Sequence, residues 1–226
     1  MQHYPVYLDL GGRPCVVVGG SALAEEKALG LLAAGAHVSV VAAELTAGLA
    51  ELAAAGRVRW LPRGYRRGDL AGAFLAVVAE PDPGVRETAW LEATRGKVLL
   101  NTVDDVPRCT FIAPAVVRRG DLAVAISTGG KAPALAVRLR QRLEAELGEE
   151  HARFLELAGR VRAPLAARHP DFERRRELWY RLVDSDALDL LRRGDEGAAV
   201  ARFEEILGVS PERVAEAAAP PPGGAA

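Results

Sequence analysis

The feature that most constrains this chain is a short apolar run that leads through two glycines into a helical pattern. The run CVVVGG, Cys15–Gly20, is rich in β-branched residues without polar alternation, which is typical of a strand buried on both faces of a parallel sheet. A helical pattern follows over 22–33, and a second strand is expected at 37–41. This βαβ unit has the size of half a nucleotide-binding fold.

Strand and helix patterns continue to alternate up to about Pro114, and a strand-like entry is expected at 4–9. Further strands are expected at 58–61, 74–79 and 97–102, and further helices at 45–55 and 83–96. The alternation predicts an α/β fold with a doubly wound parallel sheet. We assign residues 1–113 to this first domain.

The pattern changes after residue 113. The segments 115–119 and 122–126 predict an antiparallel hairpin, and a long helix is expected over 133–147. Beyond Gly148 only helices are expected, at 151–168, 171–184, 187–193 and 196–207, with a short piece after Pro211. The end of the chain, 217–226, contains PPPGG and is expected to be a disordered tail.

Composition and charge exclude several classes of protein. The 29 Lys and Arg residues nearly balance the 30 Asp and Glu residues, so there is no global electrostatic reason to bind nucleic acid or an anionic membrane. The longest apolar stretch, 28–43, is shorter than the roughly 20 residues of a membrane span. The two cysteines, Cys15 and Cys109, and the four scattered histidines form no metal-binding pattern, and we expect a reduced, cytoplasmic protein.

The glycine loop is the first candidate site. Read as G-x-G-x-x-A, the dinucleotide fingerprint begins at Gly19 and ends at Ala24, with Ser21 in place of the middle glycine. A serine there either crowds the pyrophosphate or adds a hydroxyl donor to it. A glycine turn without a ligand is the alternative interpretation. The cofactor contacts expected from this loop are Gly19, Gly20, Ser21, Ala22 and Leu23.

The end of the second expected strand bears on the choice of cofactor. An acidic residue there favours the free 2′-hydroxyl of NAD, and Ala43 and Glu44 occupy this place. NAD is therefore favoured over NADP. The alternative is that Glu44 is an ordinary charge at a helix N-terminus.

Polar residues also follow the last strand of the first domain and the hairpin. Asp104 comes directly after the strand that ends with Asn101 and Thr102, at the edge of the sheet where such folds bind ligands. Alternatively, Asp104 is a turn or helix-cap residue before Pro107. A second polar loop offers hydroxyls, backbone N–H groups and an amine that suit carboxylates, or is only a glycine-rich turn. Its residues are Ser127, Thr128, Gly129, Gly130 and Lys131.

Three segments together resemble a known family. VVVGGSALAEEKALGLLAAGAHVSVVA, NTVDDVPRCTFIAPAVV and LAVAISTGGKAPALAVRLRQRLE are similar, in this order, to the precorrin-2 dehydrogenase/sirohydrochlorin ferrochelatase family of sirohaem biosynthesis. The same segments form the N-terminal part of multifunctional sirohaem synthases, and the resemblance runs from about Tyr4 to about Val183. It implies a Rossmann domain, a dimerisation segment at 114–148, a helical domain at 149–216 and an intertwined homodimer.

The resemblance also implies a reaction, the NAD-dependent oxidation of precorrin-2 to sirohydrochlorin in sirohaem or cobalamin biosynthesis. Asp104 matches the family's functional aspartate, proposed as the base, whereas the family pattern does not require Asp105. Asn101 and Thr102 are expected to face the nicotinamide, and the 127–131 loop the carboxylates of the tetrapyrrole. Some members also insert ferrous iron, which is the first alternative, and no methyltransferase domain is expected. The second alternative, suggested by Ser21, is a non-catalytic dimer that binds NAD or a tetrapyrrole.

Overall fold

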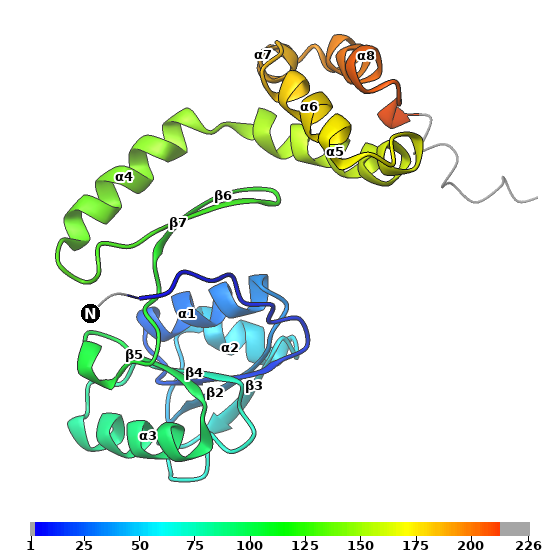
Figure 1. Cartoon of the computed structure of the whole chain (residues 1–226). Helices are drawn as coiled ribbons and strands as arrows, with labels where there is room; N and C mark the ends of the chain where they lie inside the picture. The colour runs from blue at the N-terminus through cyan, green and yellow to red at the C-terminus, as the bar shows by residue number, and fades with distance from the viewer. Residues whose placement is uncertain (1–2, 213–226) are drawn as a thin grey trace, which may run out of the picture. The chain divides into compact units, whose positions relative to one another are not determined.

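The computed structural model describes residues 3–212 (Figure 1). The chain divides into two compact units, 1–113 and 114–226, and each is described here by itself. The tail predicted at 217–226 lies outside the described residues.

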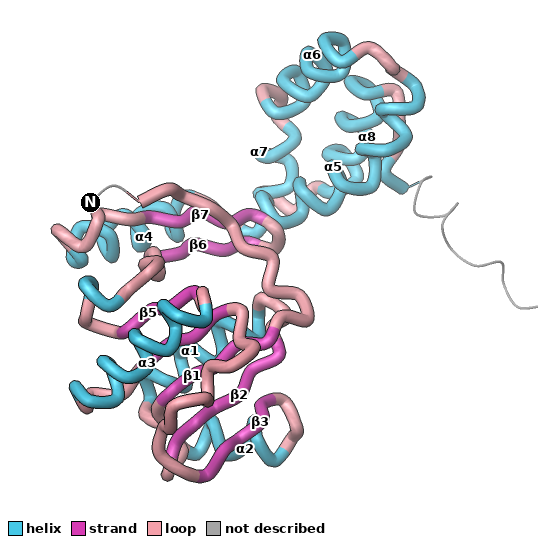
Figure 2. The backbone as a smooth tube through the Cα atoms, turned by 60° about the horizontal axis from the view of Figure 1, so that its bottom comes forward, coloured by secondary structure: helices cyan, strands magenta, loops and turns pink. Residues whose placement is uncertain are grey.

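The first unit is a parallel five-stranded sheet with the order β3-β2-β1-β4-β5 (Figure 2). Its strands are β1 (Pro14–Val18), β2 (His37–Ala42), β3 (Val58–Pro62), β4 (Leu75–Val78) and β5 (Leu99–Thr102). Its helices are α1 (Ala22–Ala33), α2 (Ala47–Ala54), α3 (Pro83–Gly96) and the short 3-10 helix η1 (Val106–Arg108). The predicted doubly wound α/β fold is confirmed. The strand order reverses between β1 and β4, which is where ligands bind in such sheets.

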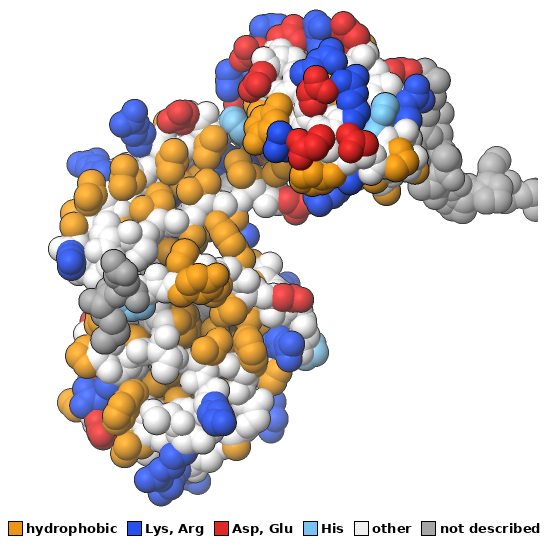
Figure 3. Space-filling model, in the orientation of Figure 1, with side chains coloured by type: hydrophobic (Ala, Val, Ile, Leu, Met, Phe, Trp, Pro, Cys, Tyr) orange, Lys and Arg blue, Asp and Glu red, His pale blue; other side chains and the backbone are white. Residues whose placement is uncertain are grey.

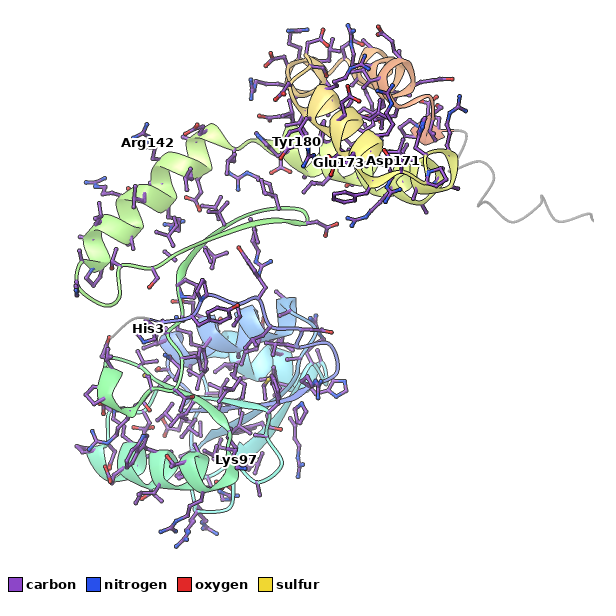
Figure 4. The ribbon with its side chains drawn as sticks, viewed as in Figure 1. His3, Lys97, Arg142, Asp171, Glu173 and Tyr180 are labelled. Carbon is purple, nitrogen blue, oxygen red and sulfur yellow. The ribbon has the colours of Figure 1, made fainter. Side chains whose placement is uncertain are left out.

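Both faces of the sheet are buried because alternate side chains of each strand point to opposite sides. Val17 and Val40 pack in one cluster with Ala24 and Ala28 of α1. Val16 and Val18 pack in a second cluster, with small residues of α3 against them. Alanines on the helices allow a close approach to the sheet. The helix α3 ends at Gly96 and is followed by Lys97, labelled in Figure 4. The backbone of Lys97 is left-handed, with φ 55°.

The strand-like entry predicted at 4–9 is wrong. The structure has no strand before β1 among the described residues, and the segment 3–9 is exposed. Tyr4 and Tyr7 have 88% and 69% of their surface exposed. A strand needs a neighbouring strand for its backbone hydrogen bonds, and none of the described strands pairs with this segment.

The second unit begins with the hairpin of β6 (Ala115–Arg119) and β7 (Leu122–Ile126), which turns at Gly120 with φ 54°. Its helices are α4 (Pro133–Glu146), α5 (Glu149–Arg168), α6 (Phe172–Val183), α7 (Ala187–Arg192) and α8 (Glu196–Leu207). The helices α5 to α8 enclose their own core, in which Leu157, Leu182 and Phe203 are fully buried. This part of the chain therefore has the apolar core that a helical bundle requires.

The helix α4 is much less buried than the bundle that follows it. Ala136 is its only buried residue, whereas Leu135, Val137 and Leu139 have 39–53% of their surface exposed. Figure 3 shows hydrophobic side chains in a row along this helix. An exposed apolar row of this kind marks a surface that another element or chain covers.

Candidate functional site

A cleft of about 570 Å³ lies in the first unit at the carboxyl ends of its strands. Gly20 and Ser21 line it after β1, and Glu80 and Asp82 line it after β4. The remaining lining residues are Val18, Val41, Ala42, Ala43, Glu44, Leu45, Thr46, Gly64, Tyr65 and Val85. The cleft thus occupies the edge of the sheet that the strand pattern predicted for a ligand.

The two glycines of the loop are needed for the chain's own packing. Gly19 has φ 116°, and a Cβ atom there would lie 2.9 Å from the carbonyl oxygen of Ala79. A Cβ atom on Gly20 would lie only 1.8 Å from the carbonyl oxygen of Glu44. The carbonyl of Gly20 accepts a hydrogen bond of 3.0 Å from the backbone N–H of Thr46. The glycine loop is therefore held against the ends of β2 and β4 at distances that only glycine permits.

The N-terminus of α1 offers donors to the cleft. Ser21 is the N-cap, and its hydroxyl oxygen accepts a hydrogen bond of 3.4 Å from the N–H of Ala24. The first intrahelical bond runs from the N–H of Glu25, so the N–H groups of Ala22 and Leu23 have no hydrogen-bond partner within residues 3–212. A helix N-terminus with free N–H groups attracts an anion such as a pyrophosphate. Because Ser21 accepts through its oxygen, its hydroxyl proton is available as a further donor.

The charged residues that line the cleft are all acidic, namely Glu44, Glu80 and Asp82. Asp82 caps α3, accepting hydrogen bonds of 2.7 Å and 3.0 Å from the N–H groups of Gly84 and Val85. Ala43 and Glu44 are exposed directly after β2. Such a lining accepts a ribose with free hydroxyls and repels an additional phosphate.

Asp104 and its neighbour Asp105 have different environments. Asp104 has a left-handed backbone with φ 60° and is exposed, and its carboxylate makes no hydrogen bond or ion pair within residues 3–212. The carboxylate of Asp105 pairs with Arg108 at 2.9 Å, and Arg108 pairs with Glu87 of α3 at 2.8 Å. The carboxylate of Asp104 is thus free, and it lies on a turn that is held against α3 by the ion pairs of Arg108.

Cys109 forms hydrogen bonds within the same turn. Its Sγ accepts hydrogen bonds from the backbone N–H of Thr102 at 3.3 Å and from the Asn101 side chain at 3.6 Å. The Thr102 hydroxyl donates to the carbonyl of Arg108 at 3.0 Å. Burial, together with the charge of Asp105, raises the pKa of the Cys109 thiol, which keeps it protonated and unreactive. Asn101 and Thr102 are buried and bonded within the chain, so their contact with nicotinamide stays a prediction.

The second polar loop lies in the second unit, before α4. Ser127 and Thr128 accept hydrogen bonds of 3.2 Å and 3.4 Å from the backbone N–H groups of Gly129 and Ala132. Gly129 and Gly130 both have positive φ, and Lys131 is exposed. The loop is thus a turn that needs its glycines and also leaves an amine in solvent. Its contact with a tetrapyrrole stays a prediction.

The sequence analysis missed the part of the cleft contributed by β3 and β4. Tyr65 follows β3, and Asp82 and Val85 begin α3. The helix expected at 83–96 begins where the N-cap signature Asp82-Pro83 places it, but its start was not recognised as part of the cleft. Nothing in the pattern near Tyr65 indicated that it lines the same cleft as the glycine loop.

Three family models match successive parts of the chain. The family described as "Putative NAD(P)-binding" matches residues 6–115, the sirohaem biosynthesis protein central region matches 119–146, and the sirohaem synthase dimerisation region matches 150–207. The chain belongs to the sirohaem biosynthesis family. Within this family, the first unit is the NAD(P)-binding part, as the glycine loop predicted.

Relatives and a solved structure agree with this family. The chain is 40% identical to siroheme synthase 3 of Aeromonas hydrophila over 88% of its own length, and 38% identical to siroheme synthase of Chromobacterium violaceum over 92%. It spans only 43% and 44% of the length of these two relatives. A solved structure, SirC, precorrin-2 dehydrogenase, matches with a TM-score of 0.74 and 26% identity, covering 95% of this chain and 100% of that chain.

The described part of the chain lacks two features, a membrane-spanning helix and a cluster of metal ligands. No helix in the described part of the chain has the length and hydropathy needed to cross a bilayer. Residues 3–212 also contain no group of three His, Cys, Asp or Glu side chains that could hold a metal ion.

Proposed function

We propose that this chain is a precorrin-2 dehydrogenase that uses NAD as the hydride acceptor and forms sirohydrochlorin. The observation that carries the proposal is the free carboxylate of Asp104, placed after β5 in a unit whose other strand ends line a dinucleotide cleft. The proposal is also supported by the match to SirC, a precorrin-2 dehydrogenase, along the whole length of that structure.

The oxidation removes a hydride and a proton from the tetrapyrrole. When bound, NAD accepts the hydride. The N–H groups of Ala22 and Leu23 and the hydroxyl of Ser21 would bind its pyrophosphate, and Glu44 would bind the adenosine ribose. Asp104 would take the proton as general base, because its carboxylate is exposed and has no partner to compete for it.

The direct test is to incubate the full chain with precorrin-2 and NAD, and to follow NADH absorbance and the spectrum of sirohydrochlorin. We expect stoichiometric NADH formation, with a KM for NADP at least roughly tenfold above that for NAD because the cleft lining is acidic. The absence of turnover despite NAD binding would favour the non-catalytic dimer.

Iron insertion is the second candidate activity, because the same free carboxylate could take the protons that leave the pyrrole nitrogens. Sirohydrochlorin and ferrous iron, added after the oxidation in the same sample, test it. A rate no higher than that without protein would restrict the chain to the dehydrogenase reaction.

Arg108 should position the turn that carries Asp104. Arg108→Ala removes the pairs to Asp105 and Glu87, so the carboxylate of Asp104 loses its fixed place. We expect kcat to fall roughly tenfold with an unchanged Kd for NAD. Steady-state kinetics and NAD titration measure the two quantities. Glu87→Gln should reproduce part of the loss, and Arg57→Ala, in an exposed turn, is the control.

We further propose that the chain is a homodimer in which the exposed apolar row of α4 is covered. Leu135 and Leu139 are four residues apart and share one face of the helix. The double variant Leu135→Glu/Leu139→Glu should be a monomer by size-exclusion chromatography with light scattering, because burying each leucine contributes about 1.5–3 kcal/mol. Gln141→Glu, which faces away from these two leucines, should remain a dimer.

The place of the dimer interface also stays a proposal. The family model whose description names dimerisation matches 150–207, whereas the resemblance led us to assign the dimerisation segment to 114–148. A bundle variant such as Tyr180→Glu, at an exposed side chain of α6, would tell whether α5 to α8 also contribute to the interface.

A further inference from the structure

One carboxylate of α3 holds the loop between β3 and β4. Glu92 accepts hydrogen bonds from the Tyr65 hydroxyl at 2.6 Å and from the backbone N–H groups of Gly68 and Leu70 at 2.8 Å and 2.9 Å. All three donors belong to one short segment, 65–70. Glu92 itself does not line the cleft. Its carboxylate is thus used to fix a loop rather than to meet a ligand.

A second set of hydrogen bonds, made by Asp69, also holds this loop. Arg63 forms a two-bond pair with Asp69, with both N–O distances 2.7 Å, and the N–H of Arg66 also donates to Asp69. The Arg63 guanidinium lowers the pKa of Asp69, which keeps this pair charged. Leu70 is fully buried beneath the loop. The segment therefore has one defined conformation.

Tyr65 is the residue that this loop presents to the cleft. Tyr65 lines the cleft and packs at the edge of the apolar cluster between the sheet and α3. Burial and the Glu92 carboxylate raise the pKa of the Tyr65 hydroxyl, so this group remains a hydrogen-bond donor to Glu92. The hydroxyl is thereby engaged with α3, and the ring is what the chain offers to a ligand.

The strand order indicates which half of a dinucleotide meets Tyr65. The pyrophosphate would bind after β1, and the ribose next to it would meet Glu44 after β2. In the sheet, β3 lies beyond β2 on the same side, and Tyr65 follows β3. The adenine, beyond the ribose, would thus reach the Tyr65 ring, and aromatic rings stack on nucleic-acid bases.

We propose that Tyr65 forms the adenine-side wall of the cleft and that Glu92 is the positioning residue that fixes this wall. The inference rests on the proposed function, because it takes the cleft to be the NAD site. Glu92 contacts neither cofactor nor substrate in this proposal. It acts through the loop, and its replacement should affect affinity for the adenosine half of NAD alone.

The test is calorimetric titration of the full chain with NAD, with ADP, and with nicotinamide mononucleotide, which lacks adenosine. Tyr65→Ala should weaken NAD and ADP binding by roughly 5- to 150-fold, the range for the loss of one base stack. Glu92→Gln should weaken both on the order of tenfold, because an amide cannot accept bonds at both of its ends. Tyr65→Phe, which keeps the ring, should cost only about threefold.

Kinetics provide the second readout. For Glu92→Gln we expect a KM for NAD raised in proportion to the Kd, with kcat at saturating NAD unchanged, and an unchanged affinity for nicotinamide mononucleotide. Glu51→Gln, an exposed carboxylate on α2, is the matched control and should bind NAD as the wild type does.

Three outcomes would overturn the inference. Binding of NAD and ADP within twofold of wild type in both Glu92→Gln and Tyr65→Ala would exclude Tyr65 as the wall. An equal loss for ADP and nicotinamide mononucleotide would show general loosening instead of positioning. If Glu92→Gln does not fold, the two Tyr65 variants decide by the same criteria. A wild-type chain that binds neither NAD nor ADP would overturn the proposed function as well.

Discussion

Asp104→Asn is expected to lower kcat for precorrin-2 oxidation by about 10²- to 10⁴-fold, the contribution typical of a general base. Asparagine is the sharper replacement because Asp104 has φ 60°, a left-handed backbone that asparagine tolerates and alanine does not. The variant thus removes the charge while keeping the turn. NADH formation under saturating precorrin-2 and NAD measures the effect.

The affinity for NAD is the internal control for this variant. Asp104 does not line the dinucleotide cleft, so the Kd of Asp104→Asn for NAD should equal that of the wild type. Asp104→Ala adds the cost of an unfavourable backbone and should be slower still or less stable. Retention of more than about a third of wild-type kcat in the asparagine variant would remove the carboxylate from the mechanism.

Gly20→Ala is expected to damage both the stability of the first unit and its affinity for NAD. The added Cβ would lie 1.8 Å from the carbonyl oxygen of Glu44 and 3.0 Å from the Cβ of Ala42. Because the nearest atom is backbone, the loop and the end of β2 must move apart, which costs about 1–3 kcal/mol. At about 2–4 °C per kcal/mol, thermal unfolding should show the loss, and NAD affinity should fall at least roughly tenfold.

Gly30→Ala is the matched control for this substitution. Gly30 lies within α1, and a Cβ atom there meets no atom within 4 Å. Alanine should stabilise the helix by about 0.5–1 kcal/mol and leave NAD affinity unchanged. If Gly20→Ala behaved like Gly30→Ala, the close approach of the loop to β2 would have no functional role.

Local signals account for the elements whose ends were predicted well. The helix over 22–33 begins after the cap Ser21, and the helix over 83–96 begins at Pro83, directly after the cap Asp82. Where the prediction began a helix too early, at Leu45, the structure shows why: Thr46 is the cap, accepting a hydrogen bond of 3.3 Å from the N–H of Leu49. The hairpin strands were predicted with the ends that the structure has.

Patterns without a tertiary partner misled the sequence analysis. The segment 4–9 has strand-like residues but pairs with no strand. The side chains of Asn101 and Thr102 bond to the segment that follows β5, which the strand pattern did not indicate, and their contact with a ligand stays a prediction. A polar residue at a strand end can serve either purpose.

The sequence by itself determined the α/β fold, the glycine loop and the candidacy of Asp104, because these depend on periodicity, glycines and strand ends within short stretches, and the resemblance of three segments indicated the family. The tertiary structure was needed to show that Asp104 is free within residues 3–212 while Asp105 is paired with Arg108, that Arg108 also pairs with Glu87 of α3, and that Glu92 fixes Tyr65 at the cleft. The contacts of Arg108 with Glu87 and of Tyr65 with Glu92 join residues 21 and 27 positions apart. Such contacts exist only after the strands have assembled and brought their carboxyl ends to one edge of the sheet.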